Sequence, residues 1–208
     1  MNADQVAALR VLLAPTGWLD RTRSFARVLR DCARTPQGLL VVGTPDDEPW
    51  HMTAHLADEA RLARIPGLDP TLVRWAPPPG APAHLGIGLD RLAAAGRRET
   101  LLVISPEAAP DALLERVDDV RRAGATILAL DRGEGELAAL AHEALAVPAG
   151  AAPLSFDAAQ HLVTAAAGEA GPDGRSASRS RGSGASTFRS RLAQLLDTVS
   201  GPSGGPGE

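Results

Sequence analysis

The sequence predicts an α/β domain of three layers, in which helices cover both faces of a doubly wound, five-stranded parallel sheet with a flavodoxin-like strand order. Two observations favour this fold. Short, continuously apolar runs such as residues 38–43 and 100–105 are typical of strands that are buried on both faces. These runs alternate with amphipathic helical segments through short connections, and such alternation produces right-handed βαβ crossovers and a parallel sheet.

Apolar residues at helical spacing or in short runs mark each element in turn. Glycine and proline punctuate the pattern, and Gly124 is a typical helix stop because glycine accepts the left-handed conformation. The predicted helices are residues 4–13, 18–33, 50–65, 86–95, 110–123, 134–144 and 156–168. The predicted strands are residues 38–43, 71–75, 100–105, 125–130 and 145–147.

The composition changes sharply after the predicted domain, which we assign to residues 1–170. Residues 171–186 are mainly Gly, Ser and Arg and predict a disordered linker, and residues 200–208 predict a disordered end. Between them, residues 187–199 predict a short amphipathic helix. A helix of this length is marginal by itself, so we expect it to dock on the domain or on a protein partner. Its apolar face consists of Phe188, Leu192, Leu195 and Leu196.

Charge and composition limit the classes of partner. A formal net charge of −4 argues against general nucleic-acid binding, and no apolar run approaches the roughly 20 residues that span a membrane. The single cysteine, Cys32, allows no intrachain disulfide, and no secretory signal is visible. We therefore expect a cytoplasmic protein with a small-molecule ligand and neither a nucleic-acid nor a membrane partner.

Ligands of parallel sheets bind beyond the carboxyl ends of the strands, so the loops after the two most apolar strands are candidate sites. Residues 43–50 and 105–110 each place a hydroxyl beside the start of a predicted helix, which suits an anion. The candidate ligand contacts are Gly43, Thr44, Trp50, His84 and Ser105. For two of these there is an alternative: Trp50 could pack against the sheet edge, and His84 could be a solvated or capping residue.

Two histidines suggest a metal site. His51 and His55 are four residues apart and share a face of the predicted helix, which Asp58 and Glu59 extend by a further turn. Two imidazoles and a carboxylate match the preference of zinc, so His51, His55 and Asp58 are candidate ligands of a divalent metal. The alternative is that the histidines line a polar pocket or make ordinary hydrogen bonds.

The order of elements resembles the SIS (sugar isomerase) family of phosphosugar-binding domains. In this chain a strand leads through Gly43 and Thr44 to a helix, and a later strand leads through Ser105 to a helix that ends at Gly124. The predicted helix 156–168, with Gln160 and His161, resembles the closing helix of phosphoheptose-isomerase-like members. The resemblance covers roughly residues 19–168 and implies a homodimer, a sugar-phosphate ligand and Gln160 as a further ligand contact.

The loops depart from the pattern of that family. Its first loop runs Gly-x-Gly-x-Ser, whereas Pro45 and Asp46 stand in this one, and of its second motif, Ser-x-Ser-Gly-x-Thr, only Ser105 is present. Prolines supply no amide donors, and carboxylates repel a phosphate. We therefore expect the phosphate-binding site of the family to be repurposed or lost. The carboxylates concerned are Asp46, Asp47, Glu48 and Glu107.

Three hypotheses of function follow. The favoured one is a divergent SIS-like domain without a cofactor, which binds a small polar or phosphorylated sugar-type ligand in a regulatory, non-catalytic role. The second is an aldose–ketose isomerase in which His161 with Glu107 or Glu59 transfers the proton. For His161 the alternative is a neutral histidine satisfied at a helix interface. The third is a metal-dependent enzyme or metal-binding protein centred on His51 and His55.

Overall fold

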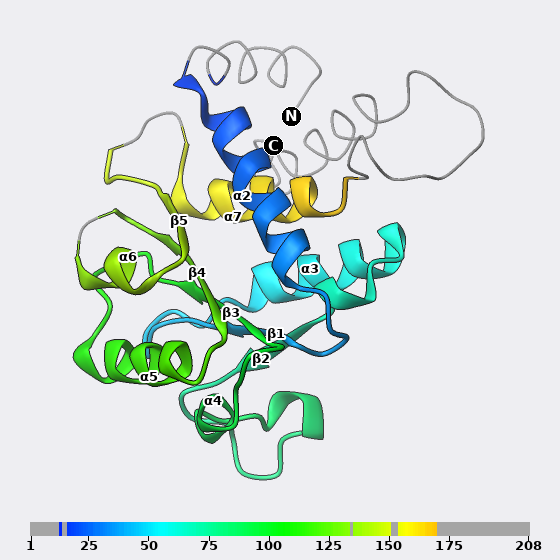
Figure 1. Ribbon diagram of the computed structural model, residues 1–208, viewed down its shortest axis with the longest axis vertical. Coiled ribbons are helices and arrows are strands. Elements are labelled where there is room, and N and C mark those ends of the chain that lie inside the picture. Colours follow the sequence, from blue (N-terminus) through cyan, green and yellow to red (C-terminus); the bar gives the residue numbers. More distant parts are fainter. Residues whose placement is uncertain (1–12, 14–15, 134, 151–153, 170–208) are drawn as a thin grey trace, which may run out of the picture.

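The computed structural model describes residues 13, 16–133, 135–150 and 154–169 (Figure 1). Almost all of the predicted helix 4–13, and the segments 171–186, 187–199 and 200–208, lie outside the described residues. The elements, in chain order, are α2 (Trp18–Cys32), β1 (Leu39–Val42), α3 (Trp50–Ala63), η2 (Pro66–Leu68), β2 (Pro70–Val73), η3 (Ala83–Leu85), α4 (Asp90–Ala93), β3 (Thr100–Ile104), α5 (Asp111–Arg122), β4 (Thr126–Asp131), α6 (Glu136–Leu140), β5 (Glu143–Ala146) and α7 (Phe156–Ala167).

The five strands form one parallel sheet in the order β2-β1-β3-β4-β5, which confirms the predicted fold class and the flavodoxin-like order. Leu39 at the start of β1 lies opposite Pro70 of β2 on one side and Thr100 of β3 on the other. The strand order reverses between β1 and β3. The loops that leave the carboxyl ends of all five strands therefore meet at one edge of the sheet.

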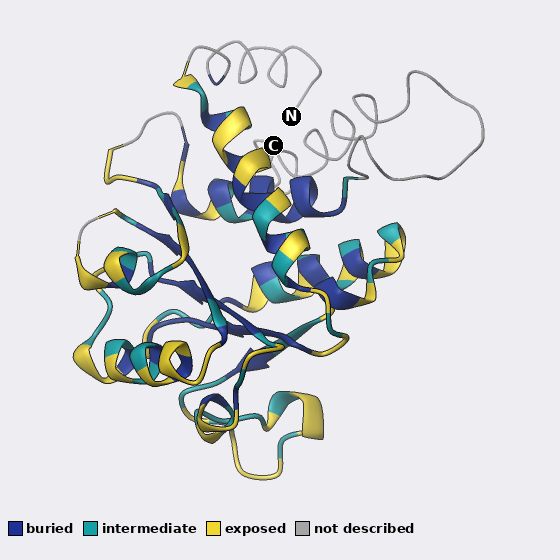
Figure 2. Cartoon of the chain, in the orientation of Figure 1, coloured by how far each residue is buried: buried dark blue, intermediate teal, exposed yellow. Residues whose placement is uncertain are grey.

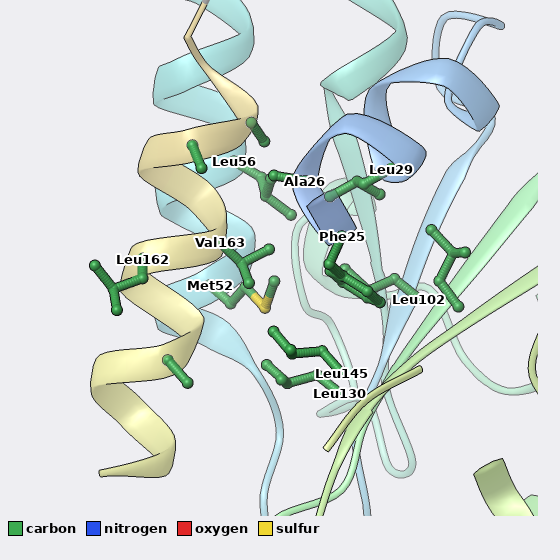
Figure 3. Close-up of a cluster of buried hydrophobic side chains, with 14 of the residues drawn as sticks. Phe25, Ala26, Leu29, Met52, Leu56, Leu102, Leu130, Leu145, Leu162 and Val163 are labelled. Carbon is green, nitrogen blue, oxygen red and sulfur yellow. The ribbon is translucent and has the colours of Figure 1, made fainter. Parts of the chain in front are cut away.

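One face of the sheet is covered by α2, α3 and α7. Figure 3 shows Phe25 of α2, Met52 of α3 and Val163 of α7 packed over Leu102 and Leu130 of the sheet. Alternate residues of each strand point to this face because side chains alternate along a strand. α7 packs against both α2 and α3, so the apolar side chains of the three helices form one continuous layer over this face.

The second face is covered by α4, α5 and α6. Leu40 and Val42 of β1, the alternates of the residues on the first face, pack with Leu113 and Val117 of α5. Figure 2 shows the strands buried between the two helical layers, with exposed residues on the outer surfaces of the helices. This two-sided burial explains why the strands carry runs of apolar residues rather than an alternating pattern.

Two predicted helices are wrong in extent. The helix predicted over 86–95 is only the four residues of α4, because Ile87 and Gly88 pair with Arg74 beyond the end of β2. The helix predicted over 134–144 is only the five residues of α6, and the last strand begins at Glu143 instead of residue 145. The alanine-rich segment fits the residue spacing of a helix as well as that of a strand. The pairing of Leu128 with Glu143 favours the strand.

His142, predicted to lie within a helix, lies between α6 and β5. Its Nδ1 accepts a hydrogen bond from the Ile127 amide at 2.9 Å, which ties β5 to β4. His142 therefore has a structural role at the start of β5 rather than a place within a helix. In the described part of the chain, no helix has the length and apolar character needed to cross a membrane.

Replacing a leucine of the first helical layer should cost far more stability than replacing one on the surface. Leu29 of α2 is 0% exposed and Leu62 of α3 is 69% exposed. We expect Leu29→Ala to lower the free energy of unfolding by about 2–5 kcal/mol and Leu62→Ala by less than about 0.5 kcal/mol. Urea unfolding of the two variants measures the difference, and equal losses would contradict the packing described.

Candidate functional site

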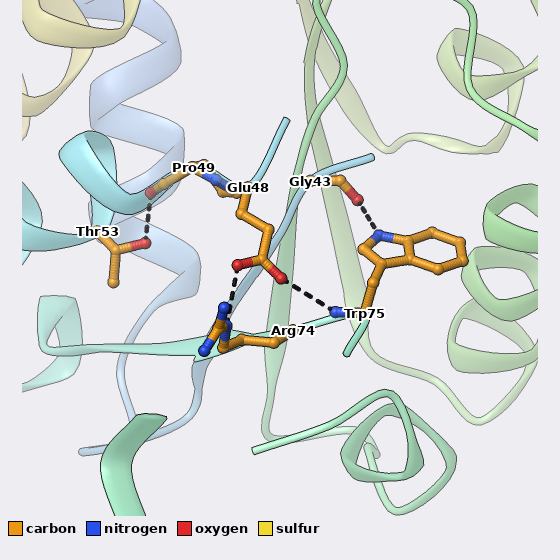
Figure 4. Close-up of polar contacts among 6 residues, drawn as sticks. All are labelled: Gly43, Glu48, Pro49, Thr53, Arg74 and Trp75. Atoms are coloured by element: carbon orange, nitrogen blue, oxygen red, sulfur yellow. Dashed lines mark hydrogen bonds and ion pairs between the residues drawn. The ribbon is translucent and has the colours of Figure 1, made fainter. Parts of the chain in front are cut away.

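The loop after β1 is held closed by contacts with the end of β2 (Figure 4). The Glu48 carboxylate accepts hydrogen bonds from Arg74 Nε at 2.9 Å and from the Trp75 amide at 3.3 Å, and it forms a largely buried ion pair with Arg74. The Trp75 indole donates to the Gly43 carbonyl at 2.8 Å. Glu48 is therefore neutralised by Arg74, and its charge is not the free repulsive charge that the sequence suggested.

The hydroxyl that the sequence offered to an anion is used inside this loop. Both the hydroxyl and the carbonyl oxygen of Thr44 accept from the Asp47 amide, at 3.2 and 3.3 Å. A Cβ at Gly43 would meet the Asp47 carbonyl and the Pro49 ring, so only glycine allows this close approach. The first loop is thus a self-contained turn in the described structure.

A pocket of about 240 Å³ opens where β3 and β4 end, between α5 and α6. The sequence predicted a ligand site at the loop that follows strand 100–105, and the pocket opens beside this loop, on the β4 side of β3. Ser105 is the one predicted ligand contact among its lining residues. We call it the acidic pocket, and its lining residues are Ser105, Glu107, Ala108, Ala109, Asp111, Leu114, Asp131, Gly135, Glu136 and Leu137.

Asp131, the last residue of β4, is the most unusual side chain of the acidic pocket. It is 3% exposed; its Oδ1 accepts from the Gly133 amide at 2.8 Å, and its buried Oδ2 has no hydrogen-bond partner in the described structure. Burial raises the pKa of this carboxyl, and the hydrogen bond from Gly133 opposes the rise. Sequence reasoning missed Asp131, although a carboxylate that ends an apolar strand was a usable signal.

The loop after β3 is fixed by contacts in which no basic side chain of the described residues lines the acidic pocket. The Ser105 hydroxyl donates to the Glu107 carbonyl at 2.6 Å. Arg132 donates from Nε to the Pro106 carbonyl at 2.7 Å, and its guanidinium lies over the Phe156 ring. Arg132 therefore holds the loop from outside and is not a lining residue of the pocket.

Trp50 and His84 line a different cavity, a groove of about 640 Å³ between α3, β2 and η3. The Arg74 guanidinium lies 4.4 Å from the centre of the Trp50 ring, which is 38% exposed. Gln160 is half-buried on α7. The structure thus distributes the predicted ligand contacts among the turn at Gly43 and Thr44, the groove, the acidic pocket and α7.

His161 of α7 packs against His55 of α3, with ring centroids 4.7 Å apart and ring planes at 72°. His161 is 7% exposed; its Nε2 lies 3.5 Å from an Asp157 oxygen, and its buried Nδ1 has no partner in the described structure. Burial lowers the pKa of His161; Asp157 opposes this, and the charges of His55 and His51 add to it. The environment favours a neutral imidazole at a helix interface.

The described residues do not fit a zinc site. Among them, no group of three or more His, Cys, Asp or Glu side chains is arranged to hold a metal ion. Asp58, proposed as the third ligand beside His51 and His55, bonds Arg61 at 2.6 Å on the surface.

The three candidate proton-transfer residues occupy different surroundings. Glu107 lines the acidic pocket on the α5 side of the sheet, and His161 is packed against His55 in the other helical layer. The Glu59 carboxylate lies against Gly168, at the end of α7. His161 and Glu107 are therefore not assembled around one substrate position in this structure.

No family model matches this chain, and no curated protein matches it. Among solved structures, it is similar to a protein assigned as sugar-binding from Salmonella typhimurium LT2, with 15% identity and a TM-score of 0.48. The match covers 90% of this chain and 56% of that protein, so this chain spans little more than half of its length. A protein assigned as a sugar-phosphate isomerase from Listeria monocytogenes has 9% identity and a TM-score of 0.42, over 85% of this chain and 78% of that one. Similarities of this size do not assign a function.

Asp131→Asn should stabilise the protein more at neutral than at acidic pH. Since the folded-state pKa of Asp131 is raised above 3.8, the contribution of Asp131 to wild-type stability falls as pH rises from 3.8 through the folded pKa. The asparagine keeps an acceptor for the Gly133 amide and has no charge to bury. The difference in unfolding free energy between variant and wild type should therefore grow between pH 4 and pH 7, as urea unfolding measures. A gap that stays constant over this range contradicts the raised pKa.

His161 should titrate below the ordinary histidine value of 6.5. With a lowered folded pKa, the unfolded chain binds the proton more tightly, so stability falls as pH drops through 6.5. The midpoint of the His161 ring signals in a two-dimensional NMR titration measures this directly. A midpoint at or above 6.5 would show that Asp157, rather than burial, dominates the surroundings of the ring.

Proposed function

We propose that this chain is a non-catalytic binding domain that holds a small hydroxylated ligand in the acidic pocket. The observation that carries the proposal is Asp131, a lining residue of the pocket whose buried Oδ2 has no hydrogen-bond partner in the described structure. A buried unsatisfied polar group costs about 1–3 kcal/mol, and a ligand hydroxyl that donates to it removes that cost. Recognition of this kind favours a polar ligand over an apolar one.

The charges of the pocket favour a ligand without a phosphate. Glu107, Asp111, Asp131 and Glu136 all line it, and among the described residues no Arg, Lys or His does. The start of α5 would attract an anion through its helix dipole, but Asp111 already occupies the first turn. At about 240 Å³ the pocket is also smaller than the roughly 300–1,000 Å³ typical of sites for drug-sized ligands.

A non-catalytic role follows from what the pocket lacks. Isomerisation needs a base beside a carbon-bound proton and a second group that polarises the carbonyl oxygen. The polar side chains that line the pocket are four carboxylates and a serine whose hydroxyl already donates to Glu107. His161, the candidate acid–base group, is packed against His55 in the other layer. From the sequence we also propose that the chain is a divergent member of the SIS family, that it forms a homodimer and that it is cytoplasmic.

A panel of hexoses and hexitols, with the corresponding phosphates, tests the proposal by thermal shift and calorimetry. We expect at least one unphosphorylated member to raise the melting temperature at millimolar concentration, because a ligand that binds only the folded state stabilises it by RT ln(1 + [L]/Kd). Asp131→Asn should abolish this shift while the unliganded protein stays folded.

The matched control is Asp69→Asn, since Asp69 lines the groove beside β2 rather than the acidic pocket. This variant should keep the ligand-induced shift. Stabilisation by the phosphorylated members alone, or a shift lost in Asp69→Asn and kept in Asp131→Asn, would refute the proposed site.

A further inference from the structure

We infer that the ligand of the acidic pocket carries a primary ammonium group, which the Asp131 carboxylate binds. The inference rests on the proposed function, because it names the chemical class of the ligand of the same pocket. Two observations carry it: the inventory of hydrogen-bonding groups that line the pocket, and the buried Oδ2 of Asp131, one of these groups, which lacks a donor in the described structure.

The side chains of the pocket offer acceptors and almost no donors. An ionised carboxylate has only acceptor sites, and four of the lining side chains are carboxylates. The Ser105 hydroxyl proton is already committed to the Glu107 carbonyl, so the remaining capacity of Ser105 is to accept. An ammonium group is the complement of such a site, because it has three donors and no acceptor. A hydroxyl has a single donor, so an ammonium group satisfies more of these acceptors than a hydroxyl does.

The nearest arginine in the sequence does not neutralise these carboxylates from within the pocket. Arg132 follows Asp131 directly, but it donates to the carbonyls of Pro106 and Val147 and lies over the Phe156 ring. The pocket therefore keeps a negative field. A cation that enters it gains a charge-assisted hydrogen bond to Asp131, and such bonds are shorter and stronger than those between neutral groups.

An organic ammonium suits the pocket better than a metal ion does. Calcium and magnesium need several oxygens that converge to about 2.0–2.6 Å, and no group of three or more acidic, His or Cys side chains among the described residues is arranged to hold a metal. Hydrogen bonds to an ammonium are longer, about 2.7–2.9 Å, so one buried carboxylate with more distant companions is sufficient. The side chains of Leu114 and Leu137, together with Ala108 and Ala109, are available to contact the carbon skeleton of the ligand.

Two matched pairs of compounds test the inference by isothermal calorimetry at pH 7.5 and constant ionic strength: serinol against glycerol, and glucamine against sorbitol. Within each pair the skeleton is kept and one hydroxyl is replaced by an amine. We expect at least one amine to bind the full chain at least tenfold more tightly than its parent polyol. N-acetylation of that amine, which removes the charge, should abolish the gain.

Variants locate the effect. Asp131→Asn should weaken binding of the amine at least tenfold, and Glu136→Gln should weaken it less because Glu136 is exposed. Asp69→Asn, in the groove, should leave it unchanged. Equal affinities for amine and polyol overturn the inference but leave the proposed function standing. Binding of neither member of either pair also overturns it, and the panel of sugars then decides the proposed function separately. Amine binding that survives Asp131→Asn places the ammonium elsewhere and contradicts the assignment.

Discussion

The structure depends on one constraint, the burial of a parallel sheet between two helical layers. β1 pairs in parallel with β2 and β3, and β3 also pairs with β4. These pairs satisfy the backbone hydrogen-bonding groups of strands whose side chains are buried on both faces of the sheet. Because every strand runs in the same direction, polar groups that cannot enter the core collect at one edge. Asp131 lies at this boundary: its backbone belongs to β4, while its carboxyl lines the acidic pocket beyond the strand.

The two loops that flank the reversal in strand order differ in how they are held: the loop after β1 is closed by its contacts, and the loop after β3 is open on its inner side. The loop after β1 is tied to the end of β2 because the Trp75 amide donates to Glu48 and the Trp75 indole donates to the Gly43 carbonyl. Within the loop, the Thr44 hydroxyl accepts from the Asp47 amide. The loop after β3 is held from outside by Arg132, and this leaves its inner side open. The candidate site has therefore moved one strand along the sheet, from the β1–β3 reversal to the ends of β3 and β4.

The sequence was sufficient for the sheet and for the outline of the helices, because continuous apolar runs and helical spacing depend on local chemistry. It failed where a local pattern fits two structures, as in the alanine-rich segment that became α6 and the start of β5. It placed Ser105 at the end of an apolar strand, and Ser105 does line the acidic pocket there, although its role as a ligand contact stays a prediction. It missed the pairing of Glu48 with Arg74 and the burial of Asp131, because both depend on contacts between loops distant in sequence. The histidines on α3 did share a face as predicted, and α7, which packs against α3, places the His161 ring beside His55. The metal site at His51 and His55 stays a prediction.

A ligand bound in the acidic pocket should change the surroundings of the backbone amides there. A map of amide chemical-shift changes on addition of glucamine measures this directly. The Gly133 amide donates to Asp131 and reports on that carboxylate, while Trp50 and His84 report on the groove. We predict that the largest changes fall on Gly133 and on the residues around Ser105. Changes confined to the groove would contradict this, and no change in either place would overturn the ammonium assignment.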